Sequence, residues 1–278
     1  MLEMRTVLSE IKNHLYLIWV VARYENKATF KGHYFGLAWE ILDPLIQVGI
    51  YFFVFGTMRG DQDIPVGFNN ENFVYVQFLP WMLVGMSVWL FMNRVTLLGS
   101  KSIQKKITLV SKMKFPTSTI PAMTLSSRLT SYFVTIVIVI IIVWSTGFGP
   151  TLLWFQWFYY FLCMLVFTYF FALLNATLTM IFKDYHQMLA PFMRILFFFS
   201  DVIWDLTGVA SLPNWVVRVS QLNPFVYIIN GFRFTFFGQG TFWQQWETTL
   251  FFWLVVFFLA IVSSHLHLKY RSKFIDLV

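Results

Sequence analysis

The chain has 278 residues, of which 58% are hydrophobic and 12% charged, with a net charge of +7. Ordinary soluble domains are about 45–50% apolar and about 25% charged, so this composition excludes a soluble globular enzyme and predicts an integral membrane protein. The basic residues cluster between long apolar stretches, as topology signals do, so no nucleic-acid partner is expected. One cysteine, Cys163, excludes a disulfide-stapled secreted domain.

Residues 1–34 are expected to form a cytoplasmic amphipathic segment. Apolar side chains recur at helical spacing on one face, at Ile11, Leu15, Ile18, Trp19 and Ala22. This pattern predicts a helix lying on the lipid of the inner leaflet, at the membrane interface. A packed cytoplasmic helix is the alternative.

A transmembrane domain is expected over residues 35–268, because a spanning helix needs about 20 mostly apolar residues. Six stretches meet this requirement, at residues 37–58, 73–98, 122–144, 152–182, 188–206 and 250–268. The fold class is therefore predicted as an all-α integral membrane protein with six transmembrane helices.

The orientation follows from the distribution of Lys and Arg in the short loops. Basic residues concentrate in the N-terminal segment, the loop 99–116, the turn at Lys183 and the tail 269–278. With six spans these regions share one side. The pattern predicts a multi-pass protein of the cell membrane with both termini cytoplasmic.

The first predicted span carries polar residues whose contact with lipid would be unfavourable. Pro44 lies inside the predicted helix and should kink it. Glu40 and Asp43 lie too deep to face lipid, so we expect them to face protein or a water-filled entrance.

Two later spans carry charges as well. Arg128 lies in the polar half of the third span and is expected to face a cavity or a partner helix. Arg194 and Asp201 are seven residues apart in the fifth span, which predicts one shared helix face. A structural role for each charge is as consistent with the pattern as a transport role.

The loop 99–116 is basic and amphipathic, and a short helix there could be the handle by which a cytosolic motor moves the membrane part. A simple positive-inside anchor is the alternative. Residues 207–245 are apolar but interrupted by Gly and Pro, which predicts short re-entrant helices before the last span. A structured external loop is the alternative.

The sequence contains no phosphate-binding glycine loop, paired-His metal motif or recognisable catalytic triad. We therefore expect no catalytic residues, no metal site and no cofactor in this chain.

Several short motifs occur in a fixed order along the chain. They are Gly36-Leu37-Ala38-Trp39 followed by Asp43-Pro44, then Lys112 with Phe115-Pro116 and Pro121, then Phe182-Lys183-Asp184, and Leu222-Asn223-Pro224 with Arg233. In this order the chain resembles the membrane subunit of an ABC-2 type exporter, in the branch that exports polysaccharides and teichoic acids. It departs from that pattern at Phe35, where the family has Leu, and at Val202-Ile203-Trp204, which replaces a Pro-Ile-x-Tyr motif.

The resemblance implies a homodimeric permease with two copies of a separate cytosolic ATPase, which would hold ATP and Mg²⁺. The ATPase-coupling residues would be Lys101, Lys105, Lys106, Ile107, Lys112, Lys183 and Asp184. The candidate entrance and pathway residues are Phe35, Gly36, Trp39, Glu40, Asp43, Arg128, Arg194 and Asp201. The external gate would contain Pro213, Trp215, Asn223, Pro224 and Arg233.

The resemblance implies export of a polymer on a polyprenyl-diphosphate carrier, and wall teichoic acid is the first expectation for that polymer. Export of O-antigen or capsular polysaccharide is the alternative, because the shared motifs do not identify the cargo. A drug exporter of the same fold and a membrane enzyme acting on a lipid-linked substrate are further alternatives.

Overall fold

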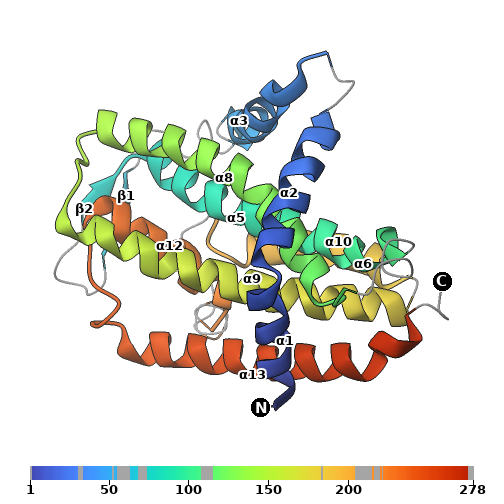
Figure 1. Cartoon of the computed structure of the whole chain (residues 1–278). Coiled ribbons are helices and arrows are strands. Elements are labelled where there is room, and N and C mark those ends of the chain that lie inside the picture. The colour runs from blue at the N-terminus through green and yellow to red at the C-terminus, as the bar shows by residue number, and fades with distance from the viewer. Residues whose placement is uncertain are drawn as a thin grey trace.

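The computed structural model describes residues 2–30, 34–51, 53–54, 63–67, 74–107, 115–182, 184–203, 215, 220 and 222–274. This part of the chain is nearly all helical (Figure 1). Its strands are β1 (Ile64–Val66) and β2 (Val74–Val76), which pair antiparallel.

Within the described ranges, four helices are long and apolar enough to cross a membrane. They are α5 (Phe78–Ser100), α8 (Thr119–Ser145), α9 (Gln156–Ile181) with the preceding turn η3 (Leu152–Phe155), and α13 (Trp246–Tyr270), which η4 (Arg271–Lys273) extends. They correspond to the second, third, fourth and sixth predicted spans. In α5 the most apolar window is 78% buried, against 28% in α13, so α5 is the centre of the bundle.

The first and fifth predicted spans correspond to shorter helices in the described residues. After the turn η1 (Gly36–Ala38), α3 (Trp39–Tyr51) has 13 residues, and α10 (Tyr185–Phe198) has 14. At 1.5 Å per residue each is about 20 Å long, less than the roughly 30 Å of a hydrocarbon core. The described residues thus contain four full-length candidate spans, and the first and fifth predicted spans, 37–58 and 188–206, extend into residues outside the described part.

The end of α10 overturns one expectation. The helix ends at Phe198 and the chain turns, with Asp201 in the left-handed region at φ +54°. Arg194 and Asp201 therefore do not share a helix face, contrary to the spacing argument. Apolar composition continues through Val202 and Ile203, which concealed the turn in the sequence.

The N-terminal segment forms α1 (Leu2–Asn13) and α2 (Leu15–Phe30), which run across the long helices (Figure 1). α1 packs on α13, and α2 packs on α8. The predicted apolar face is divided, because Ile18 and Ala22 are buried while Leu15 and Trp19 are exposed. The segment packs on the bundle and also keeps an apolar, aromatic outer side.

The two ends of the bundle carry different short elements (Figure 1). At one end, the hairpin end, β1 contacts α12 (Pro224–Phe237), a helix of 14 largely buried residues. At the other end, the α6 end, lie α6 (Ser102–Lys105), the start of α10 and the end of α13. The predicted re-entrant region 207–245 is described at α12 and the following turns, while 204–214, 216–219 and 221 lie outside the described residues.

Candidate functional site

A pocket lies between α3, α5 and α8. The described residues that line it are Pro44, Ser87, Leu90, Phe91, Arg94, Arg128, Ser131, Tyr132 and Thr135. Two of these residues are charged, and both are arginines. Arg94 of α5 forms an ion pair with Asp43 of α3, which ties the short helix to the centre of the bundle.

Both arginines lie towards the α6 end. Arg94 precedes the end of α5 at Ser100 by six residues, and Arg128 follows the start of α8 at Thr119 by nine. At 1.5 Å per residue these positions are about 9 Å and 14 Å from the helix ends. Charges at that depth need a polar partner or water, and Asp43 is that partner for Arg94.

The sequence analysis selected Arg128 and Asp43 and missed Arg94. The structure places Arg128 on the pocket and Asp43 beside it, held by Arg94. Arg94 lies inside the predicted span 73–98. An arginine within an otherwise apolar span was itself the signal that should have identified it.

An aromatic cluster lies at the start of α3. Tyr34 and Phe35 meet edge to face, as do Phe35 and Trp39, and all three rings are exposed. Gly36 between them has φ +47°, a backbone conformation that side-chain-bearing residues rarely adopt. The predicted entrance residues Phe35, Gly36 and Trp39 therefore form one exposed corner, whereas the side chain of Glu40 lies outside the described part.

A buried polar cluster lies at the hairpin end and joins three elements. Arg233 of α12 is 2% exposed, and it donates hydrogen bonds to the Val202 carbonyl and to Asn230 Oδ1, each at 3.0 Å. Asn230 Nδ2 donates to Asp201 Oδ2 at 3.2 Å. The guanidinium carbon of Arg233 also lies 3.4 Å from the centre of the Trp81 ring on α5, a cation–π arrangement.

This cluster, which we call the outer latch (Trp81, Asp201, Asn230 and Arg233), contains residues predicted for two different roles. Arg233 was expected in the gate and Asp201 in the pathway, and the structure brings them together through Asn230. Arg194 lies apart from it, exposed on α10. The other described gate residues are Asn223 and Pro224, which begin α12, and the exposed Trp215; Pro213 lies outside the described part.

Asn223 and Pro224 explain why α12 begins where it does. The Asn223 side chain accepts a hydrogen bond from the Phe225 backbone N–H at 3.0 Å, the usual N-cap contact. Pro224 occupies the first helical position, where a missing N–H costs nothing. The cap also donates to Ser200 Oγ at 2.9 Å, which fixes α12 to the turn after α10.

At the α6 end, the predicted coupling segment is held by an apolar face. Ile103 and Ile107 are buried, and they join an apolar cluster with Ile120, Ala176, Met180 and Phe274 from α8, α9 and the C-terminal turn. Lys106 forms an ion pair with Glu25 of α2, while Lys105 is exposed and Lys101 half-buried. The segment therefore packs inward while it presents charge outward. Lys112 and Lys183 lie outside the described residues, and Asp184 is exposed just before α10.

α10 is joined to the coupling segment by a histidine. His186 Nδ1 lies 2.7 Å from Ser100 Oγ at the end of α5. Partial burial, together with the ammonium groups of Lys101 and Lys105, lowers the pKa of His186 below its ordinary value of 6.5. The imidazole is therefore neutral at neutral pH, and it acts as a hydrogen-bonding partner rather than as a cation.

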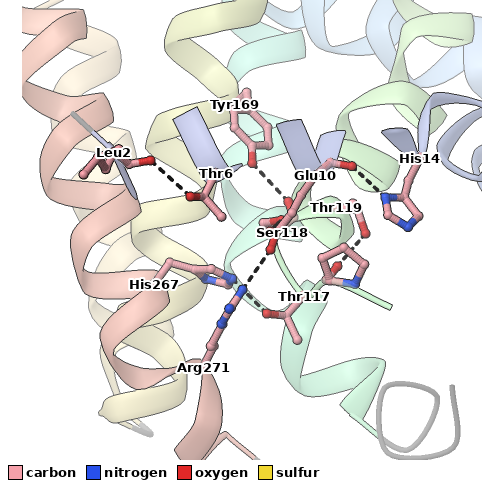
Figure 2. Close-up of polar contacts among 11 residues, drawn as sticks. Leu2, Thr6, Glu10, His14, Thr117, Ser118, Thr119, Tyr169, His267 and Arg271 are labelled. Carbon is pink, nitrogen blue, oxygen red and sulfur yellow. Dashed lines mark hydrogen bonds and ion pairs between the residues drawn. The ribbon is translucent and has the colours of Figure 1, made fainter. Parts of the chain in front are cut away.

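A second polar cluster, the inner clasp (Glu10, Ser118, Tyr169 and Arg271), fastens α1 to the bundle (Figure 2). Glu10 accepts hydrogen bonds from Ser118 Oγ and from Arg271 Nη1, the latter at 2.8 Å. Tyr169 donates to the Ser118 carbonyl at 3.0 Å. The sequence analysis missed this cluster, although Glu3 and Glu10 are seven residues apart on one helix face, and Glu3 in turn meets His265 of α13.

Comparison with known proteins places these features in a family context. The family described as "ABC-2 type transporter" matches residues 16–237. The "O-antigen export system permease protein RfbA" of Klebsiella pneumoniae is 23% identical over 257 residues, which are 92% of this chain and 93% of that protein. A protein of the same name from Myxococcus xanthus is 24% identical over 80% of each chain. The "Inner membrane transport permease YadH" of Escherichia coli K12 is 27% identical, over 74% of this chain and 79% of that protein.

Proposed function

Because the chain belongs to the ABC-2 type transporter family, we propose that it is the membrane permease of an ATP-driven exporter of a lipid-linked polysaccharide of the O-antigen type. The observation that carries the proposal is similarity to O-antigen export permeases along almost the whole chain, not along one motif. The long apolar helices, with the charged side chains of Arg94 and Arg128 inside two of them, are consistent with a membrane transport role.

The proposal changes the cargo expected from the sequence. Wall teichoic acid was the first expectation and O-antigen the alternative, and the relatives favour the alternative. Both polymers are carried on a polyprenyl diphosphate, so the short motifs common to the branch could not separate them. O-antigen-type polysaccharide is therefore the proposed cargo.

Energy would come from a separate cytosolic ATPase, the partner with which permeases of this family work. We propose a homodimer of this chain with two ATPase subunits that hold ATP and Mg²⁺. The contact on this chain would be the coupling segment around α6, where Lys101 and Lys105 face outward while Ile103 and Ile107 anchor the segment. Lys112, Lys183 and Asp184 would extend that surface.

In this arrangement the α6 end is cytoplasmic and the hairpin end is external. Both termini would then be cytoplasmic, as the distribution of basic residues predicts. The aromatic corner at Phe35, Gly36 and Trp39 would border the entrance from the inner leaflet. The outer latch around Arg233 and the start of α12 would form the external gate.

The experiment is ATP hydrolysis by the permease co-purified with the ATPase encoded beside it and reconstituted in nanodiscs. We expect polyprenyl-diphosphate-linked O-antigen polysaccharide to stimulate hydrolysis more than a teichoic acid on the same carrier. Stronger stimulation by the teichoic acid would instead identify that polymer as the cargo. If the two proteins do not associate, the proposal that this chain is part of an ATP-driven exporter is wrong.

A further inference from the structure

The charged residues of α1 and α2 are divided between two sides of these helices. The three carboxylates are half-buried and all form ion pairs with residues outside the two helices; they are Glu3, Glu10 and Glu25. The four basic side chains are all exposed; they are Arg5, Lys12, Arg23 and Lys27. In the described part of α1 and α2, the exposed charges are therefore all positive.

The division on α1 follows from the spacing of its residues. Arg5 and Lys12 are seven residues apart and share one face, while Glu3 and Glu10, also seven apart, share another. Glu3 and Arg5 differ by two residues, which is about 200° of rotation at 3.6 residues per turn. The two faces are thus nearly opposite, and the acidic one faces α13, where Glu3 meets His265.

The outward side of α2 adds aromatic rings to this charge. Tyr16 is 80% exposed and Trp19 is 57% exposed, and Arg23 lies one helical turn beyond Trp19 on the same side. The guanidinium carbon of Arg23 lies 5.5 Å from the centre of the Trp19 ring, a cation–π arrangement. Tyrosine and tryptophan together with basic residues are typical of the headgroup region of a bilayer. We call this exposed side of the two helices the cationic face, which comprises Arg5, Lys12, Tyr16, Trp19 and Arg23.

The two helices lie at the depth where the candidate spans end. They run across the long helices rather than alongside them (Figure 1). Glu10 accepts hydrogen bonds from Ser118, which directly precedes α8, and from Arg271, which directly follows α13. Because α8 and α13 are long enough to cross the hydrocarbon core, their ends mark the boundary between hydrocarbon and lipid headgroups. The cationic face therefore lies at the level of the headgroups.

We propose that the cationic face binds anionic phospholipids of the leaflet at the α6 end. Guanidinium and ammonium groups donate charge-assisted hydrogen bonds to phosphate oxygens, and the helices carry no exposed carboxylate in their described part to oppose an anionic lipid. This face differs from the apolar stripe that the sequence assigned to lipid, because Ile18 and Ala22 of that stripe are buried. The inference does not depend on which polymer is exported.

The test is native mass spectrometry of the purified full-length chain, titrated in detergent with phosphatidylglycerol or with phosphatidylcholine. The unmodified protein should prefer phosphatidylglycerol, whose head has a net negative charge. Lys12→Gln combined with Arg23→Gln should weaken phosphatidylglycerol binding about 5- to 30-fold, because each basic residue at an anionic lipid surface contributes about fivefold. Phosphatidylcholine binding should stay the same, since its head is neutral overall.

Two control variants separate charge on this face from charge in general. Lys12→Arg combined with Arg23→Lys keeps both charges and should retain the preference for phosphatidylglycerol. Lys269→Gln combined with Lys273→Gln removes two exposed charges from the end of α13 and from η4, and should also retain it. If this second control loses the preference as fully as the Lys12 and Arg23 glutamine variant, the cationic face is not the binding surface and the proposal is wrong.

Three further results would contradict the proposal. The first is equal affinity of the unmodified protein for the two lipids, and the second is an undiminished preference in the Lys12 and Arg23 glutamine variant. The third concerns the source of the phosphate: displacement of phosphatidylglycerol by millimolar inorganic phosphate, at constant ionic strength, would identify a site for free anions. If the glutamine variant instead loses an ATPase partner while its lipid binding is unchanged, the face docks a protein and the lipid assignment is wrong.

Discussion

At the residue scale, the burial of Arg233 depends on a glycine in another helix. A Cβ added at Gly85 of α5 would lie 2.5 Å from Arg233 Nη2 and 3.3 Å from the Val202 carbonyl oxygen. Arg233 can therefore reach Val202 and the Trp81 ring only because position 85 has no side chain. Sequence reasoning placed Arg233 in the gate but could not find its partners, which come from elements far apart in the chain.

The Gly85→Ala variant should accordingly be less stable. Overpacking of a filled interior costs about 1–3 kcal/mol, and here the added methyl group must displace a guanidinium from its hydrogen bonds. The measurement is the thermal unfolding midpoint of the purified protein in detergent. Gly49→Ala on α3 is the matched control, since a Cβ there meets nothing within 4 Å. Equal midpoints for the two variants would show that the outer latch does not depend on Gly85.

His186 allows a prediction about pH. Its pKa in the folded protein lies below the ordinary 6.5, so the unfolded chain takes up a proton more readily. The contribution of this residue to stability is complete above pH 6.5 and is lost as the pH falls through the lower folded-state pKa. The unfolding midpoint of the wild type should therefore decline more steeply below pH 6.5 than that of His186→Gln. Parallel declines would mean that the Ser100 contact does not depend on a neutral imidazole.

At the scale of elements, the coupling segment is connected to the N-terminal helices by charge and to the bundle by packing. Lys106 pairs with Glu25 of α2, while Ile103 and Ile107 bury against α8, α9 and Phe274. A displacement of α6 by the ATPase would therefore move α2 and the long helices together. The short length of α6 is compensated by these contacts.

Charge reversal tests this connection. Glu25→Lys should weaken the dependence of ATP hydrolysis on substrate, because two ammonium groups would then repel each other between α2 and α6. Adding Lys106→Glu should restore coupling by re-forming the pair in the opposite sense. The measurement is substrate-stimulated ATPase activity of the reconstituted complex, with Lys27→Glu, at an exposed position of α2, as the control charge reversal. If the double variant is no better than Glu25→Lys, the pair does not carry the coupling.

Some of these elements could be predicted from the sequence and others could not. The four long helices were predictable because each contains about 20 apolar residues and lipid imposes no other pattern. The end of α10 was not predictable, because Val202 and Ile203 continue the apolar composition after the backbone has turned at Asp201. Arg94 was readable as an intramembrane charge, whereas the break between α1 and α2 at His14 has no strong local signal.

At the scale of the whole molecule, polar contacts fasten the bundle at both ends. The inner clasp holds α1 to α8 and to the end of α13 (Figure 2). The outer latch holds α12 to α5 and to the turn after α10. Between these ends the short helix α3 packs against α5 and α8, and the ion pair between Asp43 and Arg94 joins it to α5. Such a division suits a transporter, whose ends must open in turn while its helices stay assembled.

The most direct measurement of the central claim is the location of the lipid-linked polysaccharide in cells of the native host that lack this gene. Export by this chain predicts that the polymer disappears from the cell surface and accumulates on its carrier at the cytoplasmic face. Re-expression of the unmodified gene should restore surface polymer. Normal surface polysaccharide in the deletion strain, with no cytoplasmic accumulation, would contradict the assignment of this chain as its exporter.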